Sequence, residues 1–100
     1  AVTGIACSNT STSGNISQNT IHSLSTTAVS ALGISVTGAA TTTVARNKIY
    51  NLSSSNANAN TFGINVTSGT TVNLNNNVIG DLRAPSANAA NPVVGLNISG

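Results

Sequence analysis

Two short motifs alternate along this chain, and both return about every thirty residues. In the first, an apolar residue is followed by Asn three places later, by Ile at five and by Leu at eight, in residues 16–24, 44–52 and 74–82. The second has Gly, then Ile or Leu, then any residue and an apolar residue or Cys; it begins at Gly4, Gly33, Gly63 and Gly95. The motif asparagines are 28 and 30 residues apart, and the glycines are 29, 30 and 32 apart. Two independent markers with one period predict a solenoid.

Each repeat carries the alternation that is typical of β-strands. Leu32, Ile34 and Val36 alternate with Gly33 and Ser35, and the pattern returns in residues 62–66 and 94–98. A period of two predicts a strand whose apolar residues form one buried face. Second and third strands are expected around Val44 and Ile49, because clusters of Gly, Ser, Thr and Asn separate these segments and favour turns.

Units of three short strands, stacked on copies of themselves, predict an all-β, right-handed parallel β-helix. We expect a single segment over residues 1–100, with about three coils of 28–32 residues, as a fragment of a longer array. The coils are placed at 2–30, 31–60 and 61–92, with a partial coil at 93–100. Three segments rich in small and polar residues are predicted to be surface excursions on one side of the solenoid: 25–31, 53–61 and 83–93.

Equivalent side chains of successive coils should stack at about 4.8 Å. The predicted structural ladders are Asn19, Asn47 and Asn77; Ile21, Ile49 and Ile79; Leu24, Leu52 and Leu82; and Gly4, Gly33, Gly63 and Gly95. Asn tolerates left-handed backbone and bonds neighbouring backbone groups, so Asn47 is expected at a tight corner. Stacked Asn amides can also bond one another along the axis. Cys7 aligns with Val36 and should point inward as a small apolar residue.

The scarcity of charge fits this stacking. Charged residues make up 4% of the chain, against roughly 25% in ordinary globular proteins. Like charges stacked on every rung would repel one another, whereas Asn, Ser and Thr avoid that cost. The hydrophobic content of 39%, regularly spaced, argues against the disorder that a low-complexity polar composition would otherwise indicate.

The residues that carry chemistry are few. Asp81 is the only side-chain carboxylate, and glycoside hydrolysis requires a pair. We therefore expect no enzyme activity, no catalytic, cofactor-binding or metal site, and no cofactor. Three cations, Arg46, Lys48 and Arg83, do not make the basic stripe of a nucleic-acid partner. No apolar run approaches the roughly 20 residues of a membrane span.

Other interpretations share parts of the pattern. The segment Val72-x-Leu74-x-x-Asn77-x-Ile79 fits a leucine-rich repeat, but the other two units have Gly14 and Thr42 where this one has Val72. Runs of Thr at 41–43 and 70–71 suggest an ice- or mineral-binding array, which the first unit does not continue. His22 aligns with Tyr50 and Gly80, and is expected at an exposed, outward position.

The order N-x-I-x-x-L, a loop of Ser, Ala and Asn, and G-I-x-V resembles the parallel β-helix repeat regions of large secreted, adhesin-like proteins of Bacteroidota. The phrase Asn77-Val78-Ile79-Gly80-Asp81-Leu82-Arg83-Ala84-Pro85 is especially similar to them. This resemblance implies an extracellular or cell-surface location, export by type IX secretion, and a structural or adhesive role. Expected partners are neighbouring coils of the same longer chain, the secretion machinery and surface glycans. The alternative is the non-catalytic coils of a β-helical polysaccharide lyase or hydrolase, or of a glycan-binding protein.

Overall fold

A computed structural model describes residues 1–8, 13–38, 41–88 and 90–99, and all regular secondary structure within these residues is β-strand. The strands are short because turn-forming Asn, Ser, Thr and Gly interrupt each apolar alternation. Their bounds are β1 (Val2–Cys7), β2 (Ser13–Ser17), β3 (Thr20–Thr26), β4 (Ser30–Val36), β5 (Thr41–Ala45), β6 (Lys48–Ser54), β7 (Asn60–Val66), β8 (Thr71–Asn75), β9 (Val78–Ile79), β10 (Leu82–Arg83) and β11 (Val93–Ile98).

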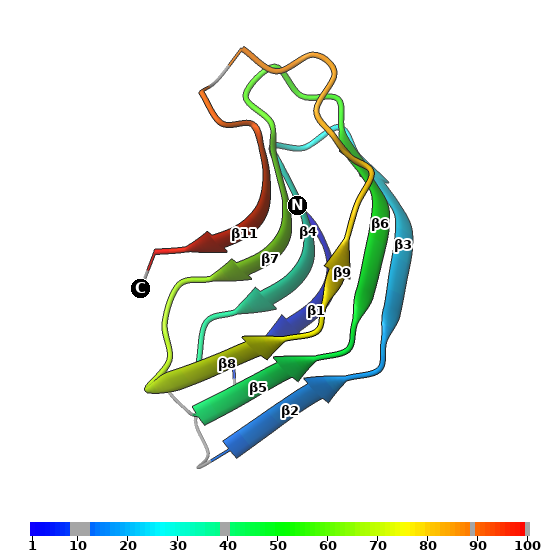
Figure 1. Ribbon diagram of the computed structural model, residues 1–100. Coiled ribbons are helices and arrows are strands. Elements are labelled where there is room, and N and C mark those ends of the chain that lie inside the picture. Colours follow the sequence, from blue (N-terminus) through cyan, green and yellow to red (C-terminus); the bar gives the residue numbers. More distant parts are fainter. Residues whose placement is uncertain (9–12, 39–40, 89, 100) are drawn as a thin grey trace.

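The strands form three parallel sheets, each of which collects equivalent strands from successive coils (Figure 1). Sheet A has the order β1-β4-β7-β11, and sheet B has the order β2-β5-β8. In sheet C, β3 and β10 flank β6, and β9 also pairs with β6. From β4 through β5 to β6 the chain in Figure 1 runs counter-clockwise while it advances towards the viewer, so the coil is right-handed. The predicted right-handed parallel β-helix is confirmed, with about three turns.

The core lies between the three sheets and is built from ladders of aliphatic side chains. Ile34, Val44, Ile49 and Leu52 have 0% of their surface exposed. Each such side chain contributes about 1.5–3 kcal/mol relative to an exposed position. Parallel pairing places equivalent residues of successive coils opposite one another, so the packing of one layer is repeated in the next. Residues one repeat apart in the sequence are therefore neighbours in the sheets.

The inward face of sheet A differs from the predicted one. Leu32 and Phe62 are only half-buried and lie outside the core, whereas Ala31 and Thr61 are fully buried at 0%. The strands of sheet A bend, as Figure 1 shows, and the change of face falls at the glycine. A Cβ on Gly33 would lie 2.7 Å from Ile49 Cγ2, so Gly33 faces inward as its neighbour in the sequence, the core residue Ile34, also does. The alternation slips by one residue there, and Leu32 turns outward.

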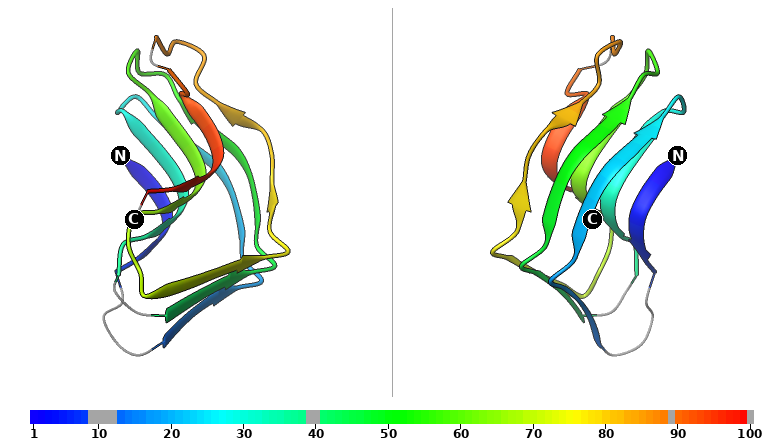
Figure 2. Two further views of the ribbon diagram at one scale, coloured as in Figure 1. Left: turned by 60° about the vertical axis from the view of Figure 1, so that its left-hand side comes forward. Right: turned by 90° about the vertical axis from the view of Figure 1, so that its right-hand side faces the viewer.

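The three predicted excursions lie on one side of the solenoid, between sheet C and sheet A (Figure 2). They are shorter than predicted, because β6 extends to Ser54 and β7 begins at Asn60. They also continue the stacking: Ser54 Oγ donates to the carbonyl of Ala28 at 2.7 Å, and Asn56 Nδ2 donates to that of Thr27 at 3.0 Å. Ser54 and Ala59 are completely buried, so parts of these segments belong to the interior.

Cys7 lies opposite Val36 in the sheet A register, as the alignment predicted. It is half-buried and packs against the core cluster. Its thiol therefore acts here as a small apolar group at the end of an interior ladder.

Candidate functional site

The structure places the predicted asparagines in one hydrogen-bonded column at the corner between sheets B and C. Asn47 Oδ1 accepts from both the backbone N–H of Asn19, at 3.1 Å, and its side-chain amide, at 3.0 Å. Asn77 Oδ1 accepts from the same two groups of Asn47, at 3.1 and 3.0 Å. The predicted bonding of Asn amides along the axis is confirmed.

Asn47 is the central and most buried member of this column, with 1% of its surface exposed. Its Nδ2 also donates to the carbonyl of Ile16 at 3.0 Å, and Asn77 Nδ2 donates to that of Val44 at 2.9 Å. Backbone carbonyls near the ends of β2 and β5 thus find partners inside the corner. The column is a structural device, because its polar atoms bond one another and the backbone.

The left-handed backbone at this corner does not belong to the asparagines themselves. The residues with positive φ are those just before them: Gln18 at 59°, Arg46 at 56° and Asn76 at 54°. The expectation that Asn47 supplies this conformation is therefore wrong. Asn47 has the role of bonding partner, and the preceding residue makes the sharp change of direction.

Replacing Arg46 by Gly should stabilise the protein by about 0.5–1 kcal/mol. Left-handed backbone costs a non-glycine residue about 1–2 kcal/mol, and part of this gain is lost to the greater freedom of Gly in the unfolded chain. Urea denaturation measures the change. Thr20→Gly is the control, since Thr20 begins β3 in extended conformation and its replacement should cost about 0.5–1 kcal/mol. Equal destabilisation by both changes would contradict the assignment.

Two further predicted ladders are coupled to each other inside the solenoid. Ile21, Ile49 and Ile79 are in register in sheet C, and the glycines lie on sheet A opposite them. A Cβ on Gly4 would lie 2.6 Å from Ile21 Cγ2, and a Cβ on Gly63 would lie 2.6 Å from Ile79 Cγ2. Gly4, Gly33 and Gly63 each make room for the isoleucine of their own coil. The leucines Leu24, Leu52 and Leu82 are also in register in sheet C, and Leu52 is fully buried.

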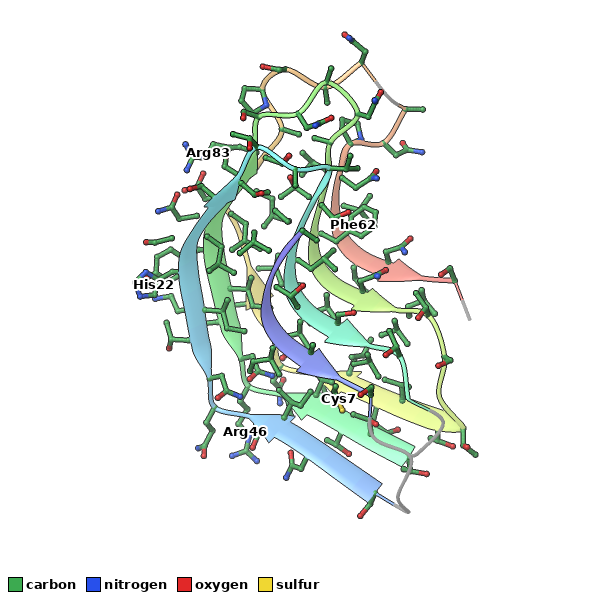
Figure 3. The ribbon with its side chains drawn as sticks, turned by 180° about the vertical axis from the view of Figure 1, so that it is seen from behind. Cys7, His22, Arg46, Phe62 and Arg83 are labelled. Atoms are coloured by element: carbon green, nitrogen blue, oxygen red, sulfur yellow. The ribbon has the colours of Figure 1, made fainter. Side chains whose placement is uncertain are left out.

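Most of the charged and ring-bearing side chains of this protein lie on the outer face of sheet C. Lys48 and Tyr50 point outward on β6, because Ile49 between them is buried. Asp81 and Arg83 are about half exposed beside β10 and are joined by an ion pair of 3.2 Å. Figure 3 shows His22, Arg46 and Arg83 along this one side of the solenoid. The charged side chains of the protein are therefore collected on one face, although their sequence positions look scattered.

An aromatic pair stands at the centre of this face. The rings of His22 and Tyr50 stack with centroids 5.1 Å apart and planes within 6° of parallel. Lys48 Nζ lies 5.4 Å from the Tyr50 ring centroid. The predicted exposed position of His22 is the observed one.

A chain of polar contacts runs beside the aromatic pair, parallel to the solenoid axis. Ser23 Oγ contacts His22 Nδ1 at 2.8 Å and accepts from Asn51 Nδ2 at 3.2 Å. Arg83 Nη2, from the following coil, donates to Asn51 Oδ1. Ser23, Asn51 and Asp81 share positive φ values, of 60°, 57° and 50°, so the third strand of every coil is kinked at this level. The kink turns these polar side chains towards solvent.

The edge of the coils at β11 is apolar and open to solvent. Leu96 and Ile98, which continue interior ladders of sheet A, are 45% and 60% exposed. Among the described residues, nothing lies within 4 Å of a Cβ built on Gly95. Leu96 also lines a depression with Ile64, Leu74 and Ile79. Positions that are buried in earlier coils are therefore exposed to solvent in β11.

In the part of the chain that the structure describes, no three His, Cys, Asp or Glu side chains come together as metal ligands. Over the same residues, there is no helix of the length and hydropathy needed to cross a membrane.

No family model, no curated protein and no solved structure matches this chain.

Proposed function

We propose that this chain is a non-catalytic structural and adhesive segment of a large secreted protein at a bacterial cell surface. In this proposal the solenoid continues into neighbouring coils of the same longer chain. The observation that carries it is the open face of β11, where Leu96 and Ile98 are exposed in positions that earlier coils bury.

Burial of these side chains by another coil of the same design would repeat contacts already made within the chain. Ile34 and Ile64 precede Leu96 on one ladder, and both are at most 1% exposed. Stacked repeats gain most of their stability from such nearest-neighbour interfaces. An extended array of this kind suits a filament or stalk, which presents a binding surface at a distance from the cell.

The surface location and the type IX export route rest on the resemblance of the repeat to secreted proteins of Bacteroidota. The low charge and the many Asn, Ser and Thr residues support it, because such a surface offers hydrogen-bonding groups to a partner. The adhesive part of the proposal assigns surface glycans as partners, along with the secretion machinery during export.

Labelling of intact cells tests the location. Lys48 is the only lysine and it is exposed, so a membrane-impermeant amine-reactive biotin reagent reports on one known side chain. We expect mass spectrometry to find biotinylated Lys48 in intact cells as abundantly as in lysed cells. A cytoplasmic protein of the same cells, which should be labelled only after lysis, is the control. Labelling of Lys48 only after lysis would overturn the surface assignment.

A further inference from the structure

The aromatic column on the outer face of sheet C has an empty third rung. His22 and Tyr50 occupy the first two rungs with centroids 5.1 Å apart, close to the ~4.8 Å that separates neighbouring strands. The rings therefore stack along the solenoid axis, one above the other in successive coils. The third coil pairs with β6 through Lys48 with Val78 and Ile49 with Ile79, which puts Gly80 opposite Tyr50.

Gly80 has no side chain to continue the column. Within the described residues, nothing lies within 4 Å of a Cβ built on Gly80. The Gly80 amide still donates to the carbonyl of Ile49 at 3.0 Å, so the backbone holds its place in the sheet. Above Gly80 there is consequently room for one flat ring against Tyr50.

The surroundings of this rung are mixed in polarity. Val78, on the same outer face, is 62% exposed and supplies an apolar surface. Asp81 directly follows Gly80 in the chain and Arg83 comes two residues later; both side chains are about half exposed. The Asp81 carboxylate accepts hydrogen bonds, and the Arg83 guanidinium has five donors, of which only part is used by Asp81 and Asn51. A ring that fits here has an apolar face and a polar rim.

We infer that the shelf formed by Tyr50, Gly80, Asp81 and Arg83 binds a neutral pyranose ring of a glycan. One face of a pyranose presents C–H groups that stack on an aromatic ring, while its hydroxyls reach outward to a carboxylate and a guanidinium. The inference rests on the proposed adhesive function and supplies the ligand class and the site. The Lys48 contact with Tyr50 is an exposed cation–π interaction, a weak one, so an incoming ring can displace it.

The shelf continues into a second polar feature that could take the next sugar of a chain. Ser25 and Ser53 lie in register with Arg83 on sheet C. With Thr26, Thr27 and Ser55 they line an open depression whose hydroxyl groups match those of a glycan. An oligosaccharide that begins at Gly80 and passes Arg83 reaches this depression, so longer glycans should bind more tightly than single sugars.

Tyrosine fluorescence tests the inference directly, because the chain has one Tyr and no Trp. The probes are methyl β-glucopyranoside, methyl β-galactopyranoside and cellotetraose, titrated into the intact protein. We expect at least one probe to change Tyr50 emission with a Kd of about 1–10 mM, typical of a small exposed site. Cellotetraose should bind at least about threefold more tightly than the single sugars, since it spans both features.

Gly80→Phe is the decisive variant, because the site has room for its ring. Its phenyl group should complete the column on Tyr50, leave the fold intact by circular dichroism, and abolish the fluorescence response. Thr20→Ala is the control, because Thr20 is exposed on the same sheet but lies in the first coil, away from Gly80, and this variant should keep the binding. No response to any probe at about ten times the expected Kd would overturn the inference. An equal response in Gly80→Phe, or a response to adenosine but to none of the sugars, would overturn it too. Labelling of Lys48 on intact cells is independent of these outcomes, so the surface assignment stands or fails separately.

Discussion

Gly33→Ala is expected to destabilise the protein by about 3 kcal/mol, whereas Gly95→Ala should leave its stability unchanged or slightly raised. The added Cβ at position 33 would lie 2.7 Å from Ile49 Cγ2 and would also run into the carbonyl oxygen of Gly63. Ile49 is completely buried, and the Gly63 carbonyl belongs to the sheet A backbone. Neither atom can move without disturbing the next coil, and overpacking of this kind typically costs about 1–3 kcal/mol or more.

Gly95 is the matched control, since it stands on the same ladder in the last coil. Nothing among the described residues lies within 4 Å of its added Cβ, and Ala in a strand avoids about 0.5–1 kcal/mol of the backbone entropy that Gly loses on folding. Guanidinium denaturation of the two variants, with equal m-values, measures the difference. Similar stability of the two variants would show that close approach of sheets A and C is not what selects glycine. In a longer array, a following coil with its own isoleucine should make Gly95→Ala as costly as Gly33→Ala.

The glycine ladder also illustrates what the sequence reveals about this fold. Its spacing predicts the coil period, because identical residues recur wherever identical environments stack. The sequence does not explain why these positions are glycine. Gly33 and Ile49 belong to different motifs, and only the packing of sheet A against sheet C brings them together. The same bend explains the wrong prediction for Leu32 and Phe62, because strict alternation does not continue through a residue that turns the strand.

The corner beside the asparagine column shows a different limit. Gln18, Arg46 and Asn76 share a left-handed backbone conformation but no chemical type. Only Asn76 belongs to a type that favours this conformation, so composition alone pointed to the neighbouring motif asparagine. The geometry of the corner, rather than the identity of the residue, sets the backbone at this position.

The outer face of sheet C was missed for a related reason. Lys48 and Arg83 are far apart in sequence and look like isolated cations. The first motif would have placed both residues on sheet C, because Lys48 directly follows the motif residue Asn47 and Arg83 directly follows the motif residue Leu82. The alignment of His22, Tyr50 and Gly80 was visible in the sequence, but not that the two rings stack with an open rung beyond them.

Asn47→Leu is expected to cost about 4 kcal/mol, which would make this asparagine one of the most important polar residues of the fold. Leu has a similar shape but no polar atoms, so the backbone N–H of Asn19 and the carbonyl of Ile16 both lose their partner. Each buried polar group left unpaired costs about 1–3 kcal/mol. The loss of the amide bond to Asn77 adds to this cost, although the backbone N–H of residue 47 can still bond Asn77 Oδ1.

Asn65→Ala is the appropriate comparison, because Asn65 also bonds an equivalent asparagine in the next coil. Asn97 Nδ2 donates to Asn65 Oδ1 at 2.7 Å, but Asn65 is only partly buried, on the outer side of sheet A. Water can replace this bond, so we expect a loss of about 0.5–1 kcal/mol. Thermal and urea denaturation of the two variants gives the comparison. If Asn47→Leu costs no more than Asn65→Ala, the buried column adds little stability, and the recurrence of Asn at this corner then has another cause. A large difference would mean that each added coil is fixed in register by a hydrogen-bonded amide as well as by its aliphatic ladder.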